Sequence, residues 1–252
     1  MNDAKLSISG PVAQITLNRA DARNALSLDL LGDLHAAVDA ITPGASNPAG
    51  PHILVITGAG KAFCAGMDLK AVLGNNSLAL ELLTSLARLT LRLRALPMVV
   101  VAKVNGAAIG GGCGLACVCD LAITHADAKL GYPEVDLGVC PAVVAPWLVR
   151  KVGAGRARKI LLTGGLMTGR EAHACAMVDV LCESASELDS KTEEIVKRLS
   201  AGGPHALAAT KKLLNELDGS LDEAIVLKGA ELSASVLATP DAQQRLRAKF
   251  GA

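Results

Sequence analysis

The stretch that most constrains the fold is the glycine run in "VVVAKVNGAAIGGGCGLA", residues 99–116. The β-branched residues before it predict a buried strand, and the apolar residues after it predict a helix. Gly110, Gly111 and Gly112 therefore fall at a strand-to-helix turn. Without a Cβ atom, the free N–H groups of such a turn can approach an anion or a developing oxyanion. The alternative is that the glycines only allow the helix to pack closely on the strand.

Two common phosphate-binding patterns do not fit this run. No Lys-Ser or Lys-Thr pair follows the glycines, as a P-loop requires. The spacing of Gly106, Gly110 and Gly112 also differs from the dinucleotide-binding fingerprint. The glycine run alone therefore leaves close helix–strand packing and the binding of a phosphate or an oxyanion open.

A second turn of the same kind is predicted by "GAGKAFCAGMDLKAV", residues 58–72. It follows a short apolar strand, "HILVITG", and carries Gly66 where the chain must bend. Two strand-to-helix turns in one sheet can direct two N–H groups at one point. That geometry would hold a carbonyl oxygen and stabilise the enolate formed from it.

A third segment, "AKLGYPEVDLGVCP" (residues 128–141), places Glu134 and Asp136 in apolar surroundings. Burial would raise the pKa of such a carboxyl group toward the range useful for proton transfer. The alternative is a surface loop with two solvated acids. For Asp136 we expect a structural or solvated role.

The order of elements predicts an α/β fold, because strands alternate with helices over the first two-thirds and helices fill the rest. We expect a core over residues 1–195 and a C-terminal helical region over 196–252, packed on the core or on a neighbouring subunit. Residues 61–69 and 128–141 are expected as loops. The expected elements are a hairpin over 5–18, helices over 27–41 and 77–96, and strands over 52–58, 98–106, 120–125 and 177–182.

Composition limits the partners. The 25 Lys and Arg nearly balance the 24 Asp and Glu, which argues against nucleic acid or a membrane surface as a partner. Seven cysteines with no apparent secretion signal predict reduced thiols in the cytoplasm. Cys113 and Cys117 lie one helical turn apart but lack the further ligands of a metal site, so no metal is expected. Tyr132 and Trp147 flank Glu134 and are expected either in an acyl pocket or in the core.

Together these segments resemble the crotonase, or enoyl-CoA hydratase/isomerase, superfamily. The likeness extends from "VAQITLNRADARNALSLDLL" near the N-terminus to "KILLTGGLMTGREAHACAMVDVL". It implies a ClpP-like spiral of ββα units with a C-terminal helical trimerisation region. It also implies a homotrimer or a hexamer made of two trimers.

The resemblance further implies the residues of the site. The backbone N–H groups of Met67 and Gly111 would form an oxyanion hole for the thioester carbonyl of an acyl-CoA, with Glu134 as the catalytic acid–base. No cofactor is expected, because coenzyme A enters as part of the substrate. Substrate and CoA contacts are expected at Ala22, Arg23, Ala25, Lys61, Ala62, Asp68, Leu69 and Gly114.

The chain departs from the family pattern in two places. Gly114 stands where hydratases of the family typically carry a first glutamate, and the glycine-rich stretch after the catalytic loop is replaced by "PAVVAPWLVR". We expect the missing side chain at Gly114 to leave space that a branched or carboxylated acyl chain fills. The sequence around these two places is similar to that of a subgroup of hydratases of such enoyl-CoAs, the methylglutaconyl-CoA hydratase-like proteins.

Several activities remain open at this point. The subgroup likeness favours an enoyl-CoA hydratase. A single carboxylate suits an enoyl-CoA isomerase, whose 1,3-proton shift needs only one base. A non-catalytic CoA-thioester binding protein is also compatible with the sequence, as is thioester hydrolase or decarboxylase chemistry.

Overall fold

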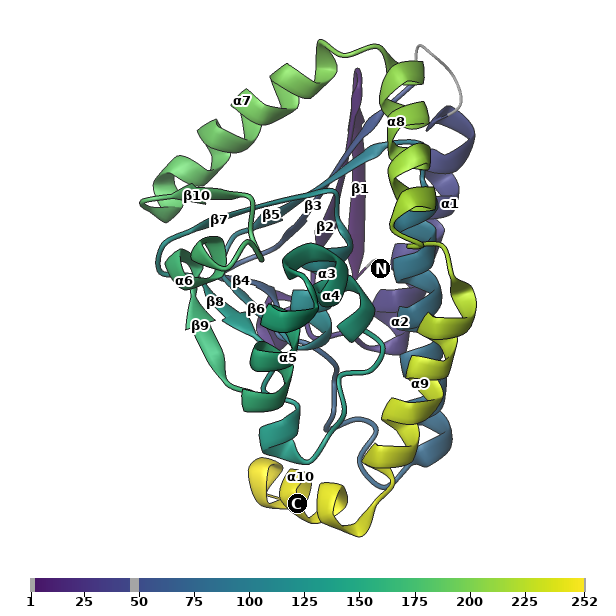
Figure 1. The fold of residues 1–252 in the computed structure, drawn as a ribbon, viewed down its shortest axis with the longest axis vertical. Coiled ribbons are helices and arrows are strands. Elements are labelled where there is room, and N and C mark those ends of the chain that lie inside the picture. The colour runs from purple at the N-terminus through teal and green to yellow at the C-terminus, as the bar shows by residue number, and fades with distance from the viewer. Residues whose placement is uncertain (1–2, 46–49, 252) are drawn as a thin grey trace.

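Two β-sheets of different strand length organise the chain (Figure 1), which is described by a computed structural model covering residues 3–45 and 50–251. Neighbouring strands of the larger sheet are parallel, except for the antiparallel hairpin of its first two strands. In spatial order this sheet consists of β1 (Ala4–Ser9), β2 (Val12–Leu17), β3 (Ile53–Gly58), β5 (Val99–Val104), β7 (Leu121–His125) and β10 (Val180–Cys182).

The smaller sheet is built from strands of only three residues. In spatial order it consists of β4 (Ala62–Cys64), β6 (Ala107–Ile109), β8 (Lys129–Gly131) and β9 (Leu166–Thr168). The chain thus runs repeatedly from a long strand to a short strand and then into a helix. The pairs β3–β4 and β5–β6 lead into α2 (Asn76–Ala95) and α3 (Gly111–Val118), and β7–β8 leads through a short 3-10 turn, η2 (Val135–Leu137), to α4 (Ala145–Val152). This repetition confirms the expected spiral of ββα units.

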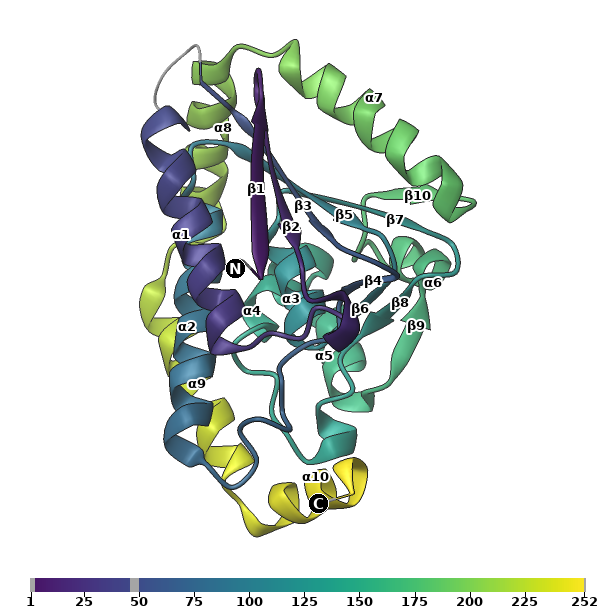
Figure 2. The same cartoon turned by 180° about the vertical axis from the view of Figure 1, so that it is seen from behind.

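Long helices cover the sheets. Along one side of the molecule α2 lies between α1 (Leu28–Ala45) and α9 (Glu223–Leu237), as both views show (Figures 1 and 2). The expected boundary between residues 195 and 196 falls inside α7. The remaining helices are η1 (Ala20–Ala22), α5 (Ala154–Thr163), α6 (Gly169–Ala174), η3 (Ala185–Glu187), α7 (Leu188–Ser200), α8 (Pro204–Leu217) and α10 (Pro240–Phe250).

The central strands β3 and β5 of the larger sheet are buried on both faces, which explains why they read as continuous apolar runs. In β3, Leu54 and Ile56 belong to the main core, whereas Ile53 and Val55 belong to a second cluster on the opposite face. The second cluster includes Leu188 at the start of α7. The alternation follows from the two-residue period of a strand.

The expected hairpin, the two expected helices and the expected strands are all present, although the strand expected over 177–182 covers only Val180–Cys182. The prediction of loops over 61–69 and 128–141 was wrong in part, because these segments contain β4 and β8. A strand of three residues is too short to show alternation, and its neighbours in the sheet are distant in the sequence.

A buried lysine fastens α8 to the core. The Lys211 side chain is 6 % exposed, and its Nζ lies 2.9 Å from Oδ2 of Asp120. The same nitrogen donates to the carbonyl oxygens of Leu93 at 3.3 Å and Met98 at 2.8 Å. One ammonium group therefore satisfies acceptors at the end of α2 and next to β5.

We expect Lys211→Ala to lower the free energy of unfolding by about 3 kcal/mol, because it leaves buried acceptors and part of the Asp120 charge unpaired. The matched control is Lys212→Ala on the same helix, where the side chain is 78 % exposed. Urea denaturation of the two variants gives the comparison. Equal stability of the two would mean that Lys211 does not anchor the helix.

Candidate active site

The first predicted turn, around Gly66, lies directly after β4. It is hydrogen-bonded to the segment that precedes α1. Leu26 donates its backbone N–H to the oxygen of Gly66 at 2.8 Å, and Asp68 donates to the oxygen of Leu26 at 3.0 Å. These two bonds hold Met67 between them. Within residues 3–45 and 50–251, the Met67 N–H donates to no protein acceptor, so this amide is available to a ligand.

The second predicted turn lies directly after β6. Gly110 has a φ of 54°, a left-handed value that glycine adopts without strain, and its N–H donates to the oxygen of Gly131 at 2.8 Å. Gly111 is the first residue of α3, where backbone N–H groups have no partner within the helix. The partial positive charge of the helix N-terminus therefore lies at this buried bend.

The two bends face each other across a short gap. A Cβ atom placed on Gly111 would lie 3.7 Å from the backbone nitrogen of Met67. Reciprocally, a Cβ atom placed on Gly66 would lie 3.7 Å from the nitrogen of Gly111. The structure therefore brings together the two amides that the sequence singled out.

Glu134 reaches the second bend from the third predicted segment. A Cβ atom placed on Gly110 would lie 2.6 Å from its Oε1 atom, so any side chain at 110 would displace the carboxylate. Its Oε2 atom is buried and accepts no hydrogen bond from the described residues. Burial raises the pKa of Glu134 to about 7, and the negative charge of Asp136 adds to the rise, against a lowering hydrogen bond from its own backbone. The expectation of a raised pKa is confirmed.

Asp136 has a structural partner. Its Oδ2 atom accepts the backbone N–H of Gly165 at 2.9 Å, which ties the turn after Glu134 to the segment before β9. The side chain is exposed and lines the outer part of the same cavity. This agrees with the expected structural or solvated role.

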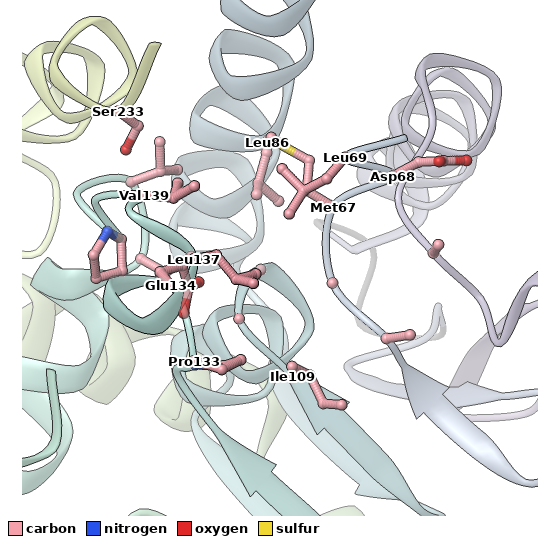
Figure 3. Close-up of a pocket in the computed structure, with 18 of the residues that line it drawn as sticks. Met67, Asp68, Leu69, Leu86, Ile109, Pro133, Glu134, Leu137, Val139 and Ser233 are labelled. Carbon is pink, nitrogen blue, oxygen red and sulfur yellow. The ribbon is translucent and has the colours of Figure 1, made fainter. Parts of the chain in front are cut away.

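A cavity of about 630 Å³ connects these groups (Figure 3), within the range of sites for small ligands. The view shows Met67 and Leu69 on one side and Glu134 and Leu137 on the other. The walls are mainly apolar, with α2 contributing Leu83 and Leu86. Of the residues predicted from the sequence, the cavity is lined by Ala22, Arg23, Ala25, Met67, Asp68, Leu69, Gly111 and Glu134.

Three predicted residues do not line the cavity. Lys61 is exposed, and Ala62 is buried with its oxygen accepting a hydrogen bond from Asn24 at 2.8 Å. Gly114 is buried in α3. Their roles in substrate binding remain predictions.

The expectation that Gly114 leaves space for an acyl chain was wrong. A Cβ atom placed on Gly114 would lie 2.1 Å from Cγ1 of Val144, so a neighbouring side chain already occupies that volume. Val144 follows the segment that carries Glu134 and belongs to the stretch that departs from the family pattern. The filling side chain lies 30 residues away in the sequence and could not be identified there.

Sequence reasoning missed Asn24. This residue is fully buried with a φ of 56°, beside Arg23 with a φ of 52°. Its Nδ2 atom donates to the oxygens of Ala59 and Ala62, and its Oδ1 atom accepts the N–H of Arg19 at 2.9 Å. Asn24 thus fixes the segment whose neighbours, Arg23 and Ala25, line the cavity. Asparagine adopts a left-handed backbone more readily than most residues. The asparagine of the Arg23–Asn24 pair was therefore the one sequence feature that could have indicated this turn.

The aromatic residues near Glu134 belong to the core. Tyr132 is 1 % exposed and Trp147 is 2 % exposed, and neither lines the cavity. The Tyr132 hydroxyl donates to Sγ of Cys117 at 3.5 Å. Cys113 in turn contacts Sδ of Met177, so these two thiols serve as packing groups.

The fold and the sequence agree on the class of protein. The structure superposes on the crystal structure of the enoyl-CoA hydratase from Bacillus halodurans with a TM-score of 0.87, at 27 % identity, covering 97 % of this chain and 99 % of that one. The architecture is therefore that of the crotonases. The model of the enoyl-CoA hydratase/isomerase family matches residues 7–244, and the chain belongs to this family.

Two relatives extend the comparison along the whole chain. A putative enoyl-CoA hydratase of Thermus thermophilus is 37 % identical over 246 residues, covering 96 % of this chain and 95 % of that protein. The short-chain-enoyl-CoA hydratase of Clostridium acetobutylicum is 31 % identical over 252 residues, covering 98 % and 94 %. Within the described residues, none of the helices has the length and apolar character needed to cross a membrane.

We expect the carboxyl group of Glu134 to make the fold less stable as the pH rises. The unfolded chain loses this proton near its ordinary pKa of about 4.3, whereas the folded chain keeps it to about pH 7. The unfolded state therefore binds fewer protons in this window, and the free energy of unfolding falls by up to about 3 kcal/mol between pH 5 and pH 8.

Urea denaturation of the wild type and of Glu134→Gln at both pH values measures this contribution. The glutamine variant lacks it, so its stability relative to the wild type should increase toward pH 8. Glu231→Gln, at an exposed position on α9, is the control and should follow the wild type. A constant difference between Glu134→Gln and the wild type would contradict the raised pKa.

Proposed function

We propose that the chain adds water to the double bond of a 2-enoyl-CoA thioester, with the Met67 and Gly111 amides as the oxyanion hole and Glu134 as the single catalytic carboxylate. The observation that carries the proposal is the buried, unpartnered Oε2 of Glu134 beside two facing bends with free N–H groups. A protein that only binds CoA thioesters has no need of a carboxyl group with a pKa near 7.

The first step is conjugate addition. Glu134, as carboxylate, accepts one proton from a water molecule while the water oxygen bonds to the β-carbon of the enoyl group. The electron pair of the double bond moves toward the thioester, and negative charge develops on its oxygen. Hydrogen bonds from the two amides stabilise this enolate, and each such donor is worth a few kcal/mol, about 3, in a site that excludes water.

The second step returns the proton. Glu134, now protonated, donates to the α-carbon of the enolate and is restored as carboxylate. The product is a 3-hydroxyacyl-CoA, and no further cofactor takes part because coenzyme A belongs to the substrate. A pKa of about 7 suits a group that must accept and then donate at neutral pH.

The CoA part is expected to lie over the rim formed by Ala22, Arg23, Ala25, Asp68 and Leu69, which lead into the cavity. Asp68 is oriented by an ion pair with Arg19, at 3.7 Å. Arg23 is exposed at this rim and is available to the phosphates of the nucleotide. The apolar walls near Leu83 and Leu86 are expected to receive the acyl chain.

The second candidate is an enoyl-CoA isomerase, favoured by the presence of one buried carboxylate. In that reaction Glu134 removes a proton from the α-carbon of a 3-enoyl-CoA and delivers it to the γ-carbon. The hydratase is preferred because the relatives at 37 % and 31 % identity are named a putative enoyl-CoA hydratase and a short-chain-enoyl-CoA hydratase. The likeness to hydratases of branched or carboxylated substrates remains a prediction.

We further propose that the chain assembles as a homotrimer or as a pair of trimers in the cytoplasm. The support for assembly is a row of exposed apolar side chains on α8 and α9, among them Leu213, Leu217 and Ile225, which are 54 %, 75 % and 52 % exposed. The support for a reducing compartment is that all seven cysteines are free.

We expect Glu134→Gln to lower turnover of every accepted enoyl-CoA by at least about 100-fold while acyl-CoA binding survives, because the amides and the cavity are untouched. The assay follows crotonyl-CoA, 3-methylglutaconyl-CoA and a 3-enoyl-CoA in parallel by the loss or gain of conjugation. Calorimetry reports the binding. Retained turnover in the variant would assign the proton transfer to another group.

We expect kcat/KM for hydration to rise with pH and to level off above about pH 7, because the free enzyme must present Glu134 as carboxylate. The measurement is the initial rate of crotonyl-CoA hydration at low substrate concentration between pH 5 and pH 9. A rate that falls through pH 7 would instead require a protonated Glu134 in the first step.

A further inference from the structure

The two departures from the family pattern meet in space. Gly114 lies at the end of the first turn of α3, and Val144 lies at the N-cap of α4, 30 residues later. Val144 is 2 % exposed and lines the cavity, whereas Gly114 does not. The valine side chain therefore stands between α3 and the cavity that contains Glu134.

The contacts show which atoms keep residue 114 a glycine. A Cβ atom placed there would lie 2.1 Å from Cγ1, 2.4 Å from Cβ and 3.5 Å from Cα of Val144. Alanine at 144 would therefore still collide with it, and only glycine at 144 would clear the space. Gly114 has no positive φ, so its backbone itself accepts any side chain. In a close-packed interior the collision cannot be absorbed without moving α4.

The same valine is one of the apolar residues that line the cavity containing Glu134. Val143 and Leu86 line the cavity with it. Asp136, the other carboxylate of the cavity lining near Glu134, is engaged by the N–H of Gly165. A reacting water would therefore contact the carboxylate of Glu134, and α3 supplies no second carboxylate to bind it.

We propose that Gly114 and Val144 form a size-exchanged pair that determines reaction specificity: valine at 144 fills the volume through which a side chain at 114 would enter the cavity. The proposal rests on the proposed function, since it concerns how that site divides between two reactions. With one carboxylate, Glu134 serves both water addition and double-bond migration. Exchanging the two sizes, with an acid at 114 and glycine at 144, adds a second carboxylate and shifts the site toward hydration.

The steric part is tested without any activity. We expect Gly114→Ala to lower Tm by about 5 °C when residue 144 is valine. In a chain that already carries Val144→Gly, the same Gly114→Ala substitution should lower Tm by less. The matched control is Val152→Gly, a buried valine of α4 outside the cavity lining, which should not reduce the loss in this way. If the changes in Tm caused by Gly114→Ala and Val144→Gly simply add in the double variant, residues 114 and 144 do not compete for the same volume and the proposal fails.

The functional part compares Gly114→Glu, Val144→Gly and the double variant Gly114→Glu/Val144→Gly. For each, the rate of crotonyl-CoA hydration is divided by the rate of 3-enoyl-CoA isomerisation. The double variant should raise this ratio at least about tenfold over the wild type, whereas Gly114→Glu alone should not. A folded double variant with the wild-type ratio would overturn the assignment of specificity.

The two failures are distinguishable. If the wild type turns over neither substrate, the proposed function fails. The Tm comparison still decides whether side chains at 114 and 144 compete for the same volume. If the wild type is active and the ratio does not move in the double variant, the proposed function stands and the specificity role is lost.

Discussion

The site depends on the parallel pairing of two three-residue strands. Ala62 and Cys64 of β4 pair with Ala107 and Ala108 of β6, so the chain leaves both strands at the same edge of the small sheet. The bend at Gly66 and the bend at Gly110 must therefore lie next to each other. Without this pairing the two amides would have no reason to share one target, and the cavity would lack its polar centre.

The third turn of the spiral adds the acid by the same means. β8 pairs with β6 through Ile109 and Gly131, and the carbonyl of Gly131 accepts the N–H of Gly110. The chain then turns at once into the segment that carries Glu134. Each of three successive ββα units thus supplies one component, and packing around the last of them buries its carboxyl group and raises the pKa.

The parts that could be predicted from the sequence are those with a local signal. The glycine bends and Glu134 lie in or after apolar runs, so residue type and order indicated them as candidates, and the resemblance to the crotonase superfamily supplied their expected roles. The short strands β4 and β8 were missed because three residues carry no periodicity. The contact of Val144 with Gly114 was missed because it joins residues far apart in the sequence, and the empty position was wrongly expected to be open. Asn24 acts through side-chain hydrogen bonds to distant carbonyls, which no local pattern indicates.

The central claim is that backbone amides at two bends bind a thioester oxygen beside one carboxyl group. The most direct measurement is a crystal structure of Glu134→Gln with bound crotonyl-CoA, in which the substrate is held without turnover. The account predicts the thioester oxygen at about 2.7–3.2 Å from the nitrogens of both Met67 and Gly111, with residue 134 beside the α-carbon. A thioester oxygen that contacts neither amide, or an acyl chain that runs away from residue 134, would contradict it.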